Sequence, residues 1–139
     1  MTPKYIIVHH SATKDDGFAN NTAAIRHWHV DVLGYRDVAY HALIESIGGT
    51  VEILIGRPWD MDGAHTLGYN DTALGVCIIG NFNIEAPDDA HLAAAARIIR
   101  LWMGLYSIPV ENVFPHKNVN ATECPGKFFD MGKLKELLA

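Results

Sequence analysis

The sequence has few of the features that mark nucleic-acid-binding proteins. Charged side chains make up only 19% of its 139 residues, and Asp and Glu outnumber Lys and Arg by 16 to 11, which gives a formal net charge of −5. No run rich in Lys and Arg is present. Because neutralisation of phosphates supplies most nucleic-acid affinity, we expect no nucleic-acid partner for this chain.

Long apolar runs are also absent. The N-terminal apolar stretch, Tyr5 to Val8, is much shorter than the roughly 7–15 residues of a signal-peptide core. No uninterrupted apolar run approaches the ~20 residues that span a bilayer. We therefore expect a chain that is made in the cytoplasm, without a signal peptide and without membrane insertion.

Cysteine is scarce, because the chain has only Cys77 and Cys124. One disulfide is arithmetically possible. The two contexts differ, however, since Cys77 lies in an apolar segment typical of a strand and Cys124 lies in a Glu-Cys-Pro-Gly sequence typical of a loop. We expect a buried, inert thiol at Cys77 and a functional thiol at Cys124.

Apolar residues and histidines, in contrast, are plentiful. Apolar residues make up 49% of the chain, enough for a hydrophobic core, and the length suits one compact domain. The eight histidines lie among apolar and glycine residues. Such histidines are candidates for metal ligands or acid–base groups.

The hydrophobic pattern predicts strands that alternate with helices. Strands are predicted at 4–8, 39–46, 50–55, 74–79 and 110–114, and an Ile-Gly-Gly turn joins the second and third into a hairpin. Apolar residues at helical spacing predict helices at 22–33, 87–106 and 130–138, and the polar segments 14–21 and 56–71 are predicted loops. This order favours an α/β fold, a single domain with a central mixed β-sheet flanked by helices.

The first candidate site is the pair His9 and His10 at the end of the first predicted strand. Successive strand residues point to opposite faces of a sheet, so only one of the two imidazoles can reach a given pocket. Spacing alone leaves open which one does so. It also leaves open that one is exposed and the other packed against a helix.

The second candidate is the pair His116 and Cys124, eight residues apart on either side of a polar segment. Zinc accepts imidazole nitrogen and thiolate sulfur, and a catalytic zinc site uses three protein ligands and keeps one position open. With one histidine of the N-terminal pair, these residues fill three positions. The residue types alone are also compatible with packed histidines and a plain loop thiol.

Two further places carry polar chemistry. Tyr40, near the start of a predicted strand, can donate a hydrogen bond to a developing oxyanion if it faces a metal site, or it is an ordinary strand aromatic. The Gly-rich loop 59–70 contains Trp59, His65 and Asn70, which suit a sugar-like or peptide-like ligand. It is equally compatible with an ordinary surface loop.

Several blocks follow one another from about Tyr5 to Gly126, nearly the whole chain. They are 7–13, 38–41, 49–52, 63–65, 68–70, 74–76 and 116–126. In this order and spacing they resemble the type 2 N-acetylmuramoyl-L-alanine amidases, a family that includes phage lysozymes of the T7 kind and the peptidoglycan recognition proteins. Several ordered blocks are a far more specific signal than any one of them.

The resemblance implies a zinc enzyme that hydrolyses the amide between N-acetylmuramic acid and L-Ala of peptidoglycan. His9, His116 and Cys124 match the family's ligands for one catalytic zinc ion, and Tyr40 matches the tyrosine beside the metal. Thr122 matches a catalytic position that is Lys in the phage lysozymes and Thr in the catalytic recognition proteins. The sequence therefore departs from its phage-like relatives at this position.

The resemblance also implies a substrate groove. His65 and Asn70 match the loop that lines it, and Trp59 lies in the same loop, so we expect all three to bind substrate. Cys124 favours an enzyme, because non-catalytic recognition proteins generally carry another residue there. The alternatives are a non-catalytic peptidoglycan-binding module and a cysteine hydrolase that uses Cys124 with a histidine.

The resemblance finally suggests a biological setting. A single zinc amidase domain over residues 1–139, without a separate cell-wall-binding domain, resembles a phage or prophage endolysin. Such a protein is made in the cytoplasm of the bacterial host, is released by a holin and lyses the cell by degrading its wall. A recycling amidase and a secreted antibacterial effector are alternatives. We expect a monomer whose partner is peptidoglycan.

Overall fold

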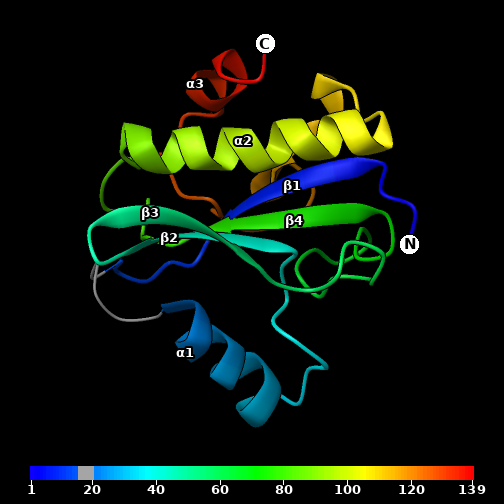
Figure 1. The fold of residues 1–139 in the computed structure, drawn as a ribbon, viewed down its shortest axis with the longest axis vertical. Helices are drawn as coiled ribbons and strands as arrows, with labels where there is room; N and C mark the ends of the chain where they lie inside the picture. The colour runs from blue at the N-terminus through cyan, green and yellow to red at the C-terminus, as the bar shows by residue number, and fades with distance from the viewer. Residues whose placement is uncertain (16–20) are drawn as a thin grey trace.

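The computed structural model describes residues 1–15 and 21–139, and its centre is a β-sheet with helices on both sides (Figure 1). The five strands run in the spatial order β3-β2-β4-β1-β5. Only the β2–β3 hairpin is antiparallel, and the other neighbours pair in parallel. The predicted mixed sheet is therefore confirmed. The strands are β1 (Tyr5–His10), β2 (Ala42–Ile47), β3 (Thr50–Ile55), β4 (Ala73–Ile78) and β5 (Val113–Pro115).

The helices form layers around this sheet. In Figure 1, α2 lies along one face of the sheet, α3 lies beyond α2, and α1 lies on the opposite side. The helices are α1 (Asn21–His27), α2 (Asp89–Tyr106) and α3 (Met131–Glu136). Short helical turns occupy Trp28–Val32, Val110–Asn112 and His116–Asn118. No helix in the described part of the chain is both long and apolar enough to cross a bilayer.

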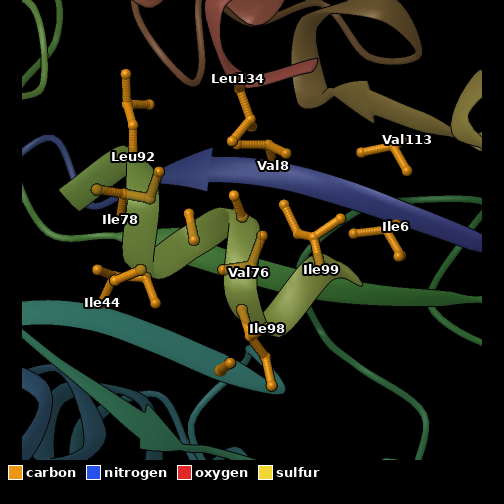
Figure 2. Packing of buried hydrophobic residues seen from close by; sticks show 14 of the residues in the cluster. Ile6, Val8, Ile44, Val76, Ile78, Leu92, Ile98, Ile99, Val113 and Leu134 are labelled. Atoms are coloured by element: carbon orange, nitrogen blue, oxygen red, sulfur yellow. The ribbon is translucent and has the colours of Figure 1, made fainter. Parts of the chain in front are cut away.

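The main core lies between the sheet and α2. Ile6 and Val8 of β1 are fully buried there, and Figure 2 shows them in one cluster with Leu92 and Ile99 of α2. Asp88 caps α2, because its carboxylate accepts a hydrogen bond from the His91 backbone N–H at 2.8 Å. The apolar face of this helix is buried at Leu92, Ile99 and Trp102, while Met103 and Tyr106 are half-buried.

A second, smaller core lies on the other face of the sheet. It contains Val38, Leu43, Cys77 and Ile79, with Tyr40 packed against it. Cys77 of β4 pairs with His9 of β1 in the parallel register. Because side chains alternate along a strand, His9 faces away from the side of the sheet that Val8 and α2 share.

Several predicted boundaries were wrong. The strand predicted from Ala39 begins at Ala42, because the Ala39 backbone N–H donates to the His29 ring rather than to a neighbouring strand. The strand predicted from Val110 begins at Val113, after a 3-10 turn. Part of the loop predicted at 14–21 lies outside the described residues.

The predicted helix at 22–33 is also altered. Helix α1 ends at His27 and the chain continues as a π-helical turn over Trp28–Val32. Of the predicted apolar face, Ile25 packs against the smaller core, but Trp28 is 54% exposed and Leu33 is 46% exposed. The sheet therefore covers only the first turns of this segment.

Candidate metal centre

Two histidines and one cysteine meet where β1 and β5 end. The two strands pair in parallel with Val8 opposite Pro115, so the residues that follow, His9 and His116, emerge side by side. Their ring centroids are 4.6 Å apart. One ligand atom from each of His9, His116 and Cys124 lies within 4.8 Å of the other two. The parallel pairing thus brings together residues that the sequence separates by more than a hundred positions.

Backbone contacts hold Cys124 at this point. Its carbonyl accepts a hydrogen bond from the Lys117 N–H at 2.9 Å, which closes the loop that begins at His116. Its Sγ accepts from the His10 backbone N–H at 3.4 Å. Cys124 and Cys77 are both free thiols, and Cys77 is fully buried in its strand. The different roles expected for the two cysteines agree with these environments.

The spacing of the donor atoms fits a zinc ion. Sγ of Cys124 lies 3.7 Å from Nδ1 of His9. Zinc bonds of roughly 2.3 Å to sulfur and about 2.0 Å to nitrogen, at a tetrahedral angle, separate the two donors by about 3.5 Å. Two imidazoles and one thiol are also a donor set that zinc prefers, with room for a fourth ligand.

Burial sets the protonation of these groups. Burial, followed by the neighbouring His65 and His116 rings, holds the pKa of His9 well below its usual value. The His9 ring is therefore neutral and has a lone pair for a metal. Burial raises the pKa of the Cys124 thiol to about 11, and the His10 N–H opposes this only in part. The thiol therefore loses its proton readily only when a bound cation compensates the negative charge of the buried thiolate.

The structure separates the two adjacent histidines. The His10 ring lies 5.9 Å from the Phe82 ring, and its Nδ1 accepts a hydrogen bond from the Phe82 backbone N–H at 3.1 Å. Only the His9 ring of the pair lies with His116 and Cys124. Alternation along β1 thus decides the question that spacing left open.

Tyr40 lies beside this cluster. Its ring centroid is 5.2 Å from that of His9. Burial, with contributions from Cys77, Cys124 and Tyr35, raises the pKa of the Tyr40 hydroxyl well above its usual value. The hydroxyl therefore keeps its proton at neutral pH and can act as a hydrogen-bond donor.

Thr122 lies at the edge of the cluster. Its side chain is exposed, and its hydroxyl accepts a hydrogen bond from the Cys124 backbone N–H at 3.2 Å. This bond shapes the turn that presents the thiol. The predicted catalytic threonine is thus close to the cysteine, with its oxygen directed at the loop backbone.

The three residues predicted to bind substrate lie in different surroundings. His65 is buried, and its Nδ1 lies 3.0 Å from Nε2 of His9. Asn70 is half-buried, and its Oδ1 accepts from the backbone N–H groups of His65 and Thr66 at 2.8 and 2.9 Å. Asn70 therefore fixes the conformation of the loop that carries His65.

Trp59 lies away from the cluster. Its ring packs edge-on against Trp102 of α2 at a centroid distance of 5.8 Å, in the main core. Because α2 covers the face of the sheet opposite to His9, the structure does not bring Trp59 to the candidate metal centre. A substrate contact by Trp59 has no support in this arrangement.

Sequence reasoning missed two polar residues of this region. The Thr66 hydroxyl lies 2.8 Å from Nδ1 of His65, and Oδ1 of Asn120 lies 2.8 Å from Nε2 of His116. The only sequence signals were the adjacency of Thr66 to His65 and the four-residue spacing of His116 and Asn120. Neither signal indicates a contact by itself.

Comparisons with known proteins give matches over most of this chain. A family model described as N-acetylmuramoyl-L-alanine amidase matches residues 1–127. The chain is 30% identical over 130 residues to peptidoglycan-recognition protein SC2 of Drosophila melanogaster, covering 88% of this chain and 67% of that protein.

Solved structures share the fold. N-acetylmuramoyl-L-alanine amidase LysC from Clostridium intestinale superimposes with a TM-score of 0.84 at 28% identity and covers 99% of this chain and 86% of that chain. The endolysin amidase LysCS from the same organism gives a TM-score of 0.82 at 30% identity, with 99% and 84% covered. The sheet order and flanking helices described above are therefore those of a known architecture.

Proposed function

This chain belongs to the N-acetylmuramoyl-L-alanine amidase family, and on that basis we propose that it is a zinc-dependent hydrolase of peptidoglycan. The bond cleaved is the amide between the lactyl group of N-acetylmuramic acid and L-Ala. The observation that carries this proposal is the convergence of His9, His116 and Cys124, whose ligand atoms lie within 4.8 Å of one another.

The three residues would hold one zinc ion. Bound zinc supplies a Lewis acid and makes water a stronger acid near neutral pH. Two neutral imidazoles and one thiolate leave the site with a net charge of about +1, which suits a transition state that gains negative charge. Burial of His9 favours the neutral ring that this charge balance requires.

Tyr40 would act on the substrate directly. As the scissile carbonyl becomes tetrahedral, its oxygen gains negative charge. The protonated hydroxyl of Tyr40, whose ring packs beside His9, would donate a hydrogen bond to it. Thr122 would add a weaker polar contact at the exposed edge of the site. With no lysine at position 122, we propose that a proton of the attacking water passes to the leaving amine, while Tyr40 keeps its own proton because burial raises its pKa.

A cysteine hydrolase is the less favoured chemistry. A thiol acts as a nucleophile as the thiolate, so a cysteine enzyme needs a lowered thiol pKa and a basic partner. Here burial raises the pKa of Cys124 to about 11 and lowers the pKa of His9, whose Nδ1 lies 3.7 Å from the sulfur. Both the raised pKa of Cys124 and the lowered pKa of His9 oppose proton transfer from the thiol to the ring.

A non-catalytic peptidoglycan-binding module is the second candidate function. The similarity to a peptidoglycan-recognition protein favours it, but Cys124 and Tyr40 would then have no required role. The two functions differ in their products. Incubation of the purified protein with a synthetic N-acetylmuramoyl peptide should release a new primary amine on L-Ala, whereas a binding module retains the peptide without releasing the amine.

For the biological role we propose a phage or prophage endolysin that acts on the bacterial cell wall as a monomer. The similarity to the endolysin LysCS over almost the whole chain supports this role. Lysis of host cells when the protein is produced together with a holin, and no lysis without one, is the expected result. Lysis that does not depend on the holin contradicts release by this route.

A further inference from the structure

The ring of His65 occupies a narrow slot beside His9. It is only 8% exposed, and two glycines form the walls of the slot. A Cβ atom on Gly75 would lie 2.6 Å from the ring, and one on Gly63 would overlap it as well. Gly75 belongs to β4, the strand that pairs with β1. The fold thus reserves space for this imidazole next to His9.

Hydrogen bonds define the tautomers of both rings. Nε2 of His65 lies 3.2 Å from the Ala73 carbonyl, which can only accept, so Nε2 carries the proton and Nδ1 of His65 does not. That bare Nδ1 lies 3.0 Å from Nε2 of His9, and one proton must lie between them. The proton therefore belongs to Nε2 of His9.

This assignment leaves Nδ1 of His9 with a free lone pair. Nδ1 is the ring atom 3.7 Å from Sγ of Cys124, where a shared zinc ion would lie. The Thr66 hydroxyl lies 2.8 Å from Nδ1 of His65 and 3.3 Å from Nε2 of His9, so it can donate to the first and accept from the second. The hydrogen bonds that join His65, His9 and Thr66 are then compatible with one arrangement of protons.

The imidazole of His116 shows the same pattern, with Asn120 as its hydrogen-bond partner. Nδ2 of Asn120 donates to the carbonyls of Val119 at 2.8 Å and Leu67 at 3.3 Å, which fixes the orientation of the amide. Its Oδ1 therefore faces Nε2 of His116 at 2.8 Å as an acceptor. His116 carries its proton on Nε2, and its Nδ1 is left free for a metal.

We propose that His65 and Asn120 are positioning residues, each of which fixes the ring orientation and the tautomer of one metal-binding histidine. The proposal rests on the proposed zinc enzyme and replaces the substrate-binding role expected for His65. Partners of this kind hold a ligand ring in place and raise its basicity, and their loss typically costs about 10–100-fold in metal affinity. A residue that only bound substrate would leave zinc affinity unchanged.

Paired variants test the proposal through zinc affinity, measured by competition with a chromophoric chelator. His65→Leu removes the acceptor and should weaken zinc binding by about 10–100-fold, whereas His65→Asn keeps an amide oxygen near the Nδ1 position and should restore most of it. Asn120→Leu, which removes the acceptor, and Asn120→Asp, which keeps an oxygen acceptor, form the corresponding pair at His116. His41→Leu is the matched control.

The control removes a buried imidazole that packs edge-on against the His65 ring at 5.7 Å but makes no hydrogen bond to His9, His65 or His116 in the described structure. His41 accepts from the Gly75 backbone N–H at 3.0 Å and lies 2.7 Å from the Met61 carbonyl. Its loss should lower the unfolding temperature and leave the zinc Kd of the folded protein within about threefold of the original. Circular dichroism confirms that each variant is folded before its Kd is compared.

The tautomers can be observed without any variant. Long-range proton–nitrogen NMR correlations of the metal-free protein should show His9 and His116 protonated on Nε2. Protonation of either ring on Nδ1 overturns the proposal, as does a folded His65→Leu protein with the original zinc Kd. If these results hold but synthetic muramoyl peptides are not cleaved, the proposed enzyme fails and the positioning roles stand.

Discussion

Sγ of Cys124 lies 3.7 Å from Nδ1 of His9, although 115 positions separate the two residues in the sequence. Parallel pairing of β1 with β5 and the loop closed by Lys117 create this contact. This contact links the sequence pattern most directly to a chemical hypothesis. A thiol and an imidazole at this separation can share one zinc ion.

Removal of the thiol should remove the metal. We expect Cys124→Ala to lose zinc and all measurable release of amine from muramoyl peptides, because two imidazoles alone hold zinc weakly. Elemental analysis of the purified protein measures the zinc content. Cys77→Ala removes the other free thiol, which is buried in β4, and is the control for zinc content, which it should retain. A zinc-free Cys124→Ala protein with full activity contradicts the metal assignment.

Loss of the Tyr40 hydroxyl should separate turnover from metal binding. We expect Tyr40→Phe to retain the zinc content and lower kcat by about 100- to 1,000-fold, as removal of an oxyanion donor does elsewhere. Steady-state kinetics on a synthetic muramoyl peptide measures this loss. If kcat stays at its original value, the hydroxyl does not assist the reaction.

Trp59 should act on stability rather than on substrate binding. Its edge-on packing against Trp102 predicts that Trp59→Ala destabilises the protein, by up to about 3–5 kcal/mol if the site does not collapse. Trp59→Phe, which keeps an aromatic ring, should retain the KM for muramoyl peptides. A large rise in KM for a stable Trp59→Phe protein supports instead the substrate contact that the sequence suggested.

We expect His91 to make the stability of the protein depend on pH. Burial lowers the pKa of His91, but hydrogen bonds to Asp15 and Asp88 at 2.9 and 2.6 Å outweigh burial and raise it above 6.5. A raised pKa in the folded state means that the contribution to stability is complete below about pH 6.5 and is lost as the pH rises through the folded-state pKa.

Urea unfolding at two pH values measures this contribution. His91→Gln should lower the unfolding midpoint more at pH 5.5 than at pH 8.5, because only the charged ring attracts both carboxylates. An equal loss at the two pH values shows that His91 contributes through packing and neutral hydrogen bonds alone.

The fold was largely predictable because its signals are local. Short continuous apolar runs mark β1 and β4, and the Gly48-Gly49 turn, with positive φ at both residues, joins β2 to β3 as expected. The end of α1 was not predictable. The apolar residues after His27 had helical spacing, but most of their surface faces away from the core.

The site was predictable only in part. The resemblance identified His9, but its contact with His65 joins β1 to a loop 56 residues away, which no spacing rule gives. The same limit applies to Trp59, because a Gly-rich loop does not show on which side of the sheet each of its side chains packs. Long-range contacts of this kind depend on the topology of the sheet rather than on local sequence.

The central claim is that this chain is a zinc-dependent amidase, and mass spectrometry of digested sacculi tests it most directly. Purified sacculi are incubated with the protein alone, with a zinc chelator, and with the chelator followed by added zinc. The account predicts free stem peptides that begin with L-Ala in the first and third samples and intact muropeptides in the second. Stem peptides that remain attached to N-acetylmuramic acid in all samples, or that are released equally with and without the chelator, contradict it.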